Sequence, residues 1–286
     1  MPNQFLYRFG PVEYDLSSRT HLVGILNVTP DSFSDGGRFF DKSRAIEHAL
    51  RMIEEGADII DIGGESTRPG SDSISVDEEL RRVIPVIEAL SAKVNIPLSI
   101  DTCKSGVARK ALEAGASIVN DVSGLTSDPE MPAVAAQYDA TVVVMHMKGT
   151  PKTMQVDPVY DDVVNEIKQF LLQQARVAEA QGVEQIILDP GIGFGKRLEH
   201  NLEIFRRFRE LTGLGYPMMI GPSRKSFIGI ILDLPVDSRF EGTAAAVAVS
   251  ILNGANLIRV HEVQAMKRVA QVVDAIKRGA SVRAPV

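Results

Sequence analysis

Eight short apolar runs recur along the chain, and each has the length and composition of a β-strand. Most of them are continuous instead of alternating between apolar and polar residues, which is typical of parallel strands buried on both faces. The predicted strands cover residues 22–28, 58–62, 97–101, 117–121, 141–146, 185–189, 217–221 and 256–260.

Between these strands, apolar residues recur at helical spacing among Ala, Glu, Lys and Arg. The predicted helices cover residues 43–55, 77–93, 105–113, 129–137, 159–181, 202–211 and 266–277, with two shorter ones near 225–232 and 242–252. Four of the strands follow a glycine that stands where a helix would end in a left-handed cap. These glycines are Gly56, Gly115, Gly182 and Gly254.

Strand and helix therefore alternate eight times, which predicts an α/β fold of the (β/α)8 TIM-barrel type. Residues 5–16, with Gly10-Pro11 in the middle, predict a short N-terminal β-hairpin before the barrel. Since no linker or low-complexity segment interrupts the pattern, we expect one domain over residues 1–286.

The composition narrows the class of protein. The 286 residues are 44% hydrophobic and 24% charged, which suits one soluble α/β barrel. The net charge of −6 argues against an extended nucleic-acid surface. A single cysteine, Cys103, excludes an intrachain disulfide and argues against a Cys-rich metal site. No apolar run reaches the roughly 18 residues of a membrane span, and the N-terminus has no secretory pattern, so a cytoplasmic protein is expected.

Polar residues stand at the carboxyl ends of seven of the eight predicted strands. In a barrel of this kind these ends meet at one mouth, where the active site lies. Any one of them could instead cap a helix, but the set predicts a site. The set is Asn27, Asp61, Asp101, Asn120 with Asp121, His146, Asp189, and Arg259 with His261.

The chemistry of this set suits a flat nitrogen heterocycle with a phosphate attached. A carboxylate such as Asp189 can accept two N–H bonds from a 2-amino-4-oxo ring, and Asn120 can read the neighbouring edge. Lys225 adds a donor for a ring carbonyl. Arg259 and His261, two apart on the last strand, are expected to face a phosphate together.

Three further segments carry candidate residues. Asn27 and Asp35, on a loop that follows the first strand, offer oxygen ligands that suit Mg²⁺. Ser223 is a predicted N-cap of the helix near 225–232. Phe194, in a glycine-rich turn, is a candidate stacking face. A packed or capping role for His146 is as well supported by the sequence as a catalytic one, and Cys103 is expected to be a structural thiol.

The motifs that carry these residues resemble the dihydropteroate synthases, over residues 24 to 277. The matching motifs are GILNVTPDSFSDGG (24–37), DIGGESTRPG (61–70), SIDT (99–102), ND (120–121), DPGIGFGK (189–196), SRKS (223–226) and RVH (259–261). The sequence departs from the expected pattern at Pro222, where a small residue such as Ala or Thr is expected.

The resemblance implies that 6-hydroxymethyl-7,8-dihydropterin diphosphate and p-aminobenzoate condense to 7,8-dihydropteroate and diphosphate, with Mg²⁺ as cofactor at Asn27 and Asp35. It also implies a homodimer and a sulfonamide target in folate biosynthesis. The implied pterin diphosphate site is Thr67, Asp101, Asn120, Met145, Asp189, Phe194, Gly221, Lys225, Arg259 and His261. The implied p-aminobenzoate pocket is Phe33, Thr67, Arg68, Pro69, Ser223 and Arg224. The implied catalytic residues are Asp35, Asp101, Lys225, Arg259 and His261.

Two alternatives share part of this site. A corrinoid methyltransferase that uses methyltetrahydrofolate could share the pterin residues, but it has no need of a metal–diphosphate loop such as residues 27–37. A non-catalytic pterin-binding protein would leave Arg259 and His261 without a function. Release of diphosphate from a mixture of both substrates separates the three activities.

Overall fold

A parallel β-barrel forms the centre of the molecule, as predicted. The computed structural model describes residues 4–29, 38–68 and 70–279. Within that part of the chain, eight parallel strands follow the order β8-β7-β6-β5-β4-β3-β10-β9, and an isolated bridge between Leu188 and Met218 joins the two ends of the sheet. The strands are β3 (His21–Asn27), β4 (Ile59–Gly63), β5 (Leu98–Asp101), β6 (Ile118–Asp121), β7 (Thr141–Met145), β8 (Ile186–Asp189), β9 (Met219–Ile220) and β10 (Leu257–Val260).

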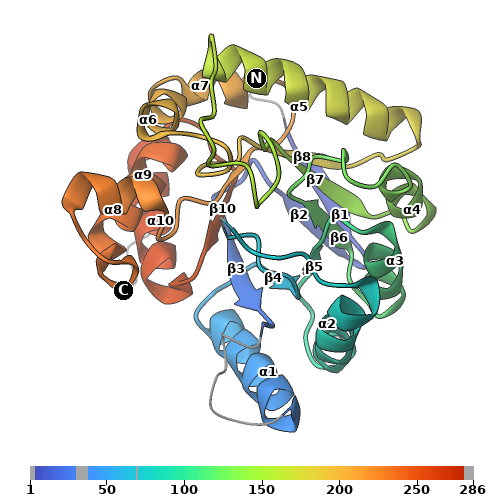
Figure 1. Ribbon diagram of the computed structural model, residues 1–286. Coiled ribbons are helices and arrows are strands. Elements are labelled where there is room, and N and C mark those ends of the chain that lie inside the picture. Colours follow the sequence, from blue (N-terminus) through green and yellow to red (C-terminus); the bar gives the residue numbers. More distant parts are fainter. Residues whose placement is uncertain (1–3, 30–37, 69, 280–286) are drawn as a thin grey trace, which may run out of the picture.

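Helices surround the barrel, as Figure 1 shows. They are α1 (Arg38–Glu54), α2 (Val76–Ser91), α3 (Ser105–Glu113), α4 (Met131–Gln137), α5 (Val163–Ala180), α6 (Leu198–Arg206), α7 (Phe208–Thr212), α8 (Ser226–Leu232), α9 (Phe240–Leu252) and α10 (Val263–Arg278), with a 3-10 turn at Val236–Ser238. The four glycines predicted to end helices all have positive φ, between 91° and 111°. That backbone region is open to glycine at no steric cost.

Several predicted boundaries were wrong, and three of the differences have a clear local reason. Helix α5 begins at Val163 because the Asp162 carboxylate caps it by accepting two backbone N–H bonds at 3.1 Å. The predicted helix over 202–211 is two helices, α6 and α7, which meet at Arg207. Strand β9 is shorter than predicted, since Pro217 has no N–H to donate and the Met218 N–H bonds to the side chain of Asn256.

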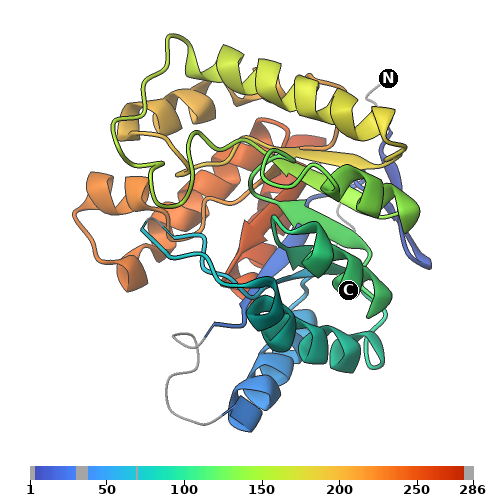
Figure 2. The ribbon, with the colours of Figure 1, turned by 45° about the vertical axis from the view of Figure 1, so that its right-hand side comes forward.

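The predicted N-terminal hairpin is present and covers one end of the barrel. Strands β1 (Leu6–Phe9) and β2 (Val12–Asp15) pair in antiparallel fashion. Phe9 and Leu16 are buried against the side chains that fill the barrel interior. The hydroxyl of Tyr7 donates to the Ile186 carbonyl at 2.7 Å, which fixes the hairpin on the start of β8. In Figure 2 the hairpin lies at the opposite end of the barrel from the β4–α2 loop, so a ligand must reach the interior from the other mouth.

The alternation of side chains along each strand decides what faces the interior. On β4, Ile60 and Ile62 pack outward into the core beneath the helices, so Ile59 and Asp61 point inward. Burial of each large aliphatic side chain in that outer core stabilises the fold by about 1.5–3 kcal/mol. Because the outward positions are fixed by this burial, the inward orientation of Asp61 follows from the sequence.

Candidate functional site at the barrel mouth

A buried network of charges joins the middle of β4 to the last two residues of β5, β6 and β10. The Arg259 guanidinium donates from Nε to Asp61 Oδ2 at 2.6 Å and from Nη2 to Asp101 Oδ2 at 2.7 Å. The Asn120 amide donates from Nδ2 to Asp61 Oδ2 at 2.9 Å. One guanidinium thus joins two carboxylates, and one carboxylate oxygen joins Arg259 to Asn120.

The burial of these charges shifts their protonation. Burial raises the pKa of Asp101, against the opposing pull of Arg259. Burial works against the charge of Arg259, but Asp61 and Asp101 outweigh it and raise the pKa of the guanidinium. Arg259 therefore stays charged. Asp101 takes up a proton at a higher pH than an ordinary aspartate does.

Three acceptor atoms of this network have no hydrogen-bond partner in the described structure. They are Asp61 Oδ1, Asp101 Oδ1 and Asn120 Oδ1, all shielded from solvent. An unsatisfied buried polar atom costs about 1–3 kcal/mol, so native proteins rarely hold three together. Such a group favours a ligand or a water that donates hydrogen bonds.

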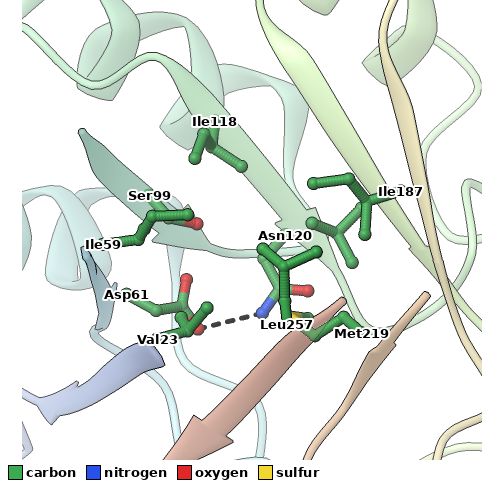
Figure 3. Close-up of a pocket in the computed structure, with 10 residues that line it drawn as sticks. Val23, Ile59, Asp61, Ser99, Ile118, Asn120, Ile187, Met219 and Leu257 are labelled. Carbon is green, nitrogen blue, oxygen red and sulfur yellow. Dashed lines mark hydrogen bonds between the residues drawn. The ribbon is translucent and has the colours of Figure 1, made fainter. Parts of the chain in front are cut away.

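The cavity directly beneath the network is too small for that ligand. Figure 3 shows Asp61, Ser99 and Asn120 around it, among apolar side chains of the barrel interior. Its volume of about 10 Å³ matches roughly one water molecule. A flat bicyclic ring must therefore lie above the network, at the ends of the strands.

Asp189, at the end of β8, completes the acceptor edge. Its Oδ1 accepts the Gly191 N–H at 2.7 Å, and burial raises the pKa of this carboxyl to about 6. Gly191 has a φ of +67°, and a Cβ there would lie 1.9 Å from the His146 carbonyl oxygen. The turn after β8 therefore requires glycine for both its backbone angle and its close approach to β7.

The ammonium group of Lys225 lies over the ring of Phe194. Its Nζ is 4.0 Å from the centre of the Phe194 ring. Burial, followed by the nearby Arg259 charge, lowers the pKa of Lys225 to about 8. Phe194 packs with Met145, Val122 and Met154 in a small buried apolar cluster. Met145, Phe194 and Lys225 thus lie together as predicted, and they supply an apolar face and a donor for a ring.

Ser223 is not the N-cap that the sequence predicted. Helix α8 begins at Ser226 with Lys225 at its N-cap position. Arg224 has a φ of +57°, which turns the chain before the helix and leaves Ser223 outside it. The Ser223 hydroxyl instead pairs with Nδ1 of His261 at 2.9 Å.

Cations gather around His261. Burial, and then the charges of Arg259, Arg224, Lys225 and Arg68, lower the pKa of this imidazole to about 3. The histidine is therefore neutral at pH 7. Two of the cations near it are already paired, Arg224 with Glu262 and Arg259 with Asp61 and Asp101. The sequence predicted that Arg259 and His261 face a phosphate together. In the structure Arg259 instead donates to Asp61 and Asp101, and His261 pairs with Ser223.

The β4–α2 loop carries Thr67, which is half-buried, and Arg68, which is exposed. It reaches the β7–α5 loop, where the Gly70 N–H donates to the Pro151 carbonyl at 3.0 Å. An exposed ion pair between Asp72 and Lys152 joins the same two loops, and such pairs contribute little to stability. These contacts bring Thr67 and Arg68 towards the mouth of the barrel.

Part of the predicted site lies outside the described residues, namely Phe33, Asp35 and Pro69. Asn27 ends β3 and is half-buried beside the mouth. No group of three or more His, Cys, Asp or Glu side chains within the described ranges forms a metal-binding cluster.

Two buried groups near the mouth had no predicted role. Asp61 appeared among the polar strand ends, but its role as the partner of Arg259 and Asn120 was not predicted. Lys196 is also buried, and its Nζ lies 3.0 Å from His146 Nδ1 and donates to the Phe194 carbonyl at 2.9 Å. His146 is packed edge-on against Phe170, which supports the structural reading of this histidine.

Comparison with known proteins places the chain in a family. The family model of pterin binding enzymes matches residues 23–261. A dihydropteroate synthase of Synechocystis is 51% identical over 272 residues, which cover 94% of each chain. The crystal structure of a dihydropteroate synthase from Clostridium difficile, obtained in the presence of pteroic acid, has a TM-score of 0.88 and 49% identity, and the match covers 93% of this chain and 100% of that one. A Yersinia pestis dihydropteroate synthase in a sulfonamide drug complex has a TM-score of 0.91 and 41% identity, with 96% and 100% covered.

Proposed function

The chain belongs to the pterin-binding enzymes and, within them, to the dihydropteroate synthases, and from this premise we propose how its own residues carry out the reaction. The substrates are 6-hydroxymethyl-7,8-dihydropterin diphosphate and p-aminobenzoate, and the products are 7,8-dihydropteroate and diphosphate. The observation that carries the proposal is the set of unpartnered acceptors at Asp61, Asp101 and Asn120 beside a corner of cations. Mass spectrometry of a reaction mixture for 7,8-dihydropteroate tests it, and a mixture without product contradicts it.

The acceptor edge holds the pterin ring. Asp189, Asn120 and Asp101 accept N–H bonds from the ring, and Lys225 donates to its carbonyl oxygen. Phe194 and Met145 pack near the ring. Because Asp101, Asn120 and Asp189 are already buried before binding, the ring gains hydrogen bonds without a large cost in side-chain ordering.

The cationic corner holds the diphosphate. We assign the diphosphate to His261, Thr67 and Arg68. Arg68 and Arg259 both act on the pKa of His261, and Arg259 also donates to Asp101 of the ring edge. When the C–O bond breaks, its electron pair leaves with the diphosphate, and the pterin methylene carbon becomes cationic. Asp101 stabilises that cation, the arylamine nitrogen forms the new C–N bond, and the amine loses one proton to solvent. No covalent bond to the protein is needed.

Asn27 fits a Mg²⁺ ion that arrives with the diphosphate. Mg²⁺ usually keeps several waters and takes one or two protein oxygens together with substrate phosphates. A single half-buried amide at the end of β3, without a complete metal cluster in the described residues, agrees with that arrangement. When bound, the ion neutralises the leaving diphosphate.

Removal of Mg²⁺ should stop turnover. Because the ion supplies several kcal/mol of charge stabilisation, excess EDTA should lower the rate by at least about tenfold, and added Mg²⁺ should restore it. Asn27→Ala, and likewise Asp35→Ala, should raise the Mg²⁺ concentration that gives the half-maximal rate. Diphosphate release at increasing Mg²⁺ measures both effects. An undiminished rate in EDTA rules out the metal.

p-Aminobenzoate should bind after the pterin substrate. Thr67 and Arg68 lie on a loop that the Gly70–Pro151 hydrogen bond and the exposed Asp72–Lys152 ion pair join to the β7–α5 loop. A bound diphosphate should fix the position of these two residues. Calorimetry should therefore detect p-aminobenzoate binding in the presence of diphosphate and at least about tenfold weaker binding without it. A sulfonamide should compete with p-aminobenzoate in steady-state kinetics. Equal affinity with and without diphosphate would refute the order.

We also propose a cytoplasmic homodimer that uses the face of helices α8, α9 and α10. Within the described residues no helix has both the length and the apolar character of a membrane span. Large apolar side chains on this face are at least 42% exposed; they are Ile230, Ile231, Phe240, Val249, Leu252, Val272 and Ile276. Helix α9 packs against both α8 and α10, and apolar side chains exposed on packed neighbouring helices are candidates for a protein interface.

The oligomeric state can be measured directly. Sedimentation should show a dimer for the unaltered chain and a monomer for the double variant Val272→Lys with Ile276→Lys. The matched control is Val177→Lys on α5, which is 42% exposed away from this face and should leave the dimer intact. A monomeric unaltered chain would contradict the dimer.

A further inference from the structure

Asp61 is a fully buried carboxylate of the mouth, with a side chain that is 0% exposed. It lies near the middle of β4, and Figure 3 shows it pointing into the barrel beside Ser99 and Asn120. The proposed reaction assigns it no contact with the reacting atoms. An isolated carboxylate is costly to bury, so its partners indicate its role.

The partners of Asp61 come from strands on both sides. Oδ2 accepts Arg259 Nε from β10 and Asn120 Nδ2 from β6. In the strand order, β10 and β6 each lie two strands away from β4, in opposite directions. One oxygen atom of Asp61 therefore binds two side chains whose strands are not neighbours in the sheet.

Each of these bonds sets an orientation. Because Nδ2 of Asn120 is committed to Asp61, the amide oxygen remains the unpartnered atom that a ring N–H can reach. Without that bond the amide could rotate by about 180° and present its donors instead. Likewise, the bond to Arg259 Nε leaves Nη2 directed at Asp101.

We propose that Asp61 is a positioning residue that couples the two halves of the substrate site, since one carboxylate oxygen orients Asn120 for the pterin ring and Arg259 for the diphosphate side. The inference rests on the proposed function. It can fail while the proposed function holds, because each half of the site could bind its ligand without a carboxylate that orients both.

The charge of Asp61 gives the proposal a signature beyond loss of affinity. Burial raises the pKa of Asp101, Arg259 lowers it, and Asp61, Glu79 and Asp121 raise it. The Lys225 ammonium also interacts with Asp101. Removal of the Asp61 charge should lower the pKa of Asp101. Pterin binding needs the carboxylate form, so the loss of binding on acidification should then begin at a lower pH.

The test uses the full chain and calorimetry from pH 5 to 9. The ligands are 6-hydroxymethyl-7,8-dihydropterin, which has no phosphate, and inorganic diphosphate. Asp61→Asn should weaken both by at least about tenfold at pH 8. It should also move the acidic midpoint of pterin binding to lower pH. The matched control is Ser99→Ala, which alters the same cavity and should leave both affinities within about twofold.

Two results would overturn the proposal. One is unchanged affinity of Asp61→Asn for both ligands; the other is an equal loss of pterin affinity at every pH with an unmoved midpoint, which indicates a purely structural role. If Asp61→Asn does not fold, Asp61→Glu keeps the charge and displaces the oxygen. That variant should lose affinity for both ligands with an unmoved midpoint, and full affinity would overturn the proposal. Absence of turnover in the unaltered chain contradicts the proposed function instead.

Discussion

Asp189→Asn is expected to abolish turnover and leave the fold intact. One oxygen of Asp189 already accepts the Gly191 N–H, and the carboxylate has the remaining lone pairs for two ring N–H groups. An amide would turn a donor towards one of those groups. Loss of two charged hydrogen bonds, each of about 1.5–3 kcal/mol, should lower kcat/KM by at least about 100-fold.

Calorimetry with a pterin analogue separates loss of binding from loss of fold. The matched control is Asp139→Asn, an exposed position before β7 where a φ of +51° suits asparagine. The control should bind and turn over like the unaltered chain. Unchanged pterin affinity in Asp189→Asn would remove this residue from the ring site.

Arg259→Ala is expected to destabilise the fold as well as the substrate complex. The substitution leaves Asp61 and Asp101 buried without their shared guanidinium, and removal of one partner from a buried ion pair costs about 3–5 kcal/mol. The free energy of unfolding in urea should fall by that amount at pH 8. At lower pH the loss should be smaller, because protonation of Asp101, whose pKa burial raises, relieves the unpaired charge.

Arg259 should also distinguish the two halves of the substrate. The diphosphate substrate should lose about 1.5–3 kcal/mol of binding free energy in Arg259→Ala, and a phosphate-free pterin should lose much less. Arg259→Lys keeps the charge without the planar fork, so it should recover stability more than affinity. Equal losses for the two ligands would contradict a role for Arg259 at the diphosphate.

The barrel could be predicted from the sequence because its strands and helices are each marked by a pattern within a single segment. Continuous apolar runs and the glycines that end helices are properties of single segments, and the structure places a strand at each predicted run. The mouth followed from the same pattern, since a parallel barrel gathers all carboxyl ends on one side. Asp101, Asn120 and Asp189 could therefore be grouped from the sequence alone.

The pairing inside that group could not be predicted in the same way. Arg259 and Asp61 are 198 residues apart, and their contact depends on the strand register around the barrel. The period of two on β4 shows that Asp61 points inward, but it does not show which cation lies opposite. Ser223 was misassigned for a similar reason, since the left-handed turn at Arg224 is not visible in the residue types around it.

The central claim concerns coupling of diphosphate release to arylamine consumption at this mouth. The direct measurement follows both quantities in one mixture of the purified chain, Mg²⁺, 6-hydroxymethyl-7,8-dihydropterin diphosphate and p-aminobenzoate. We predict one diphosphate released for each p-aminobenzoate consumed, and loss of both signals in Asp189→Asn. Release of diphosphate without consumption of p-aminobenzoate, or neither signal from the unaltered chain, would contradict the account.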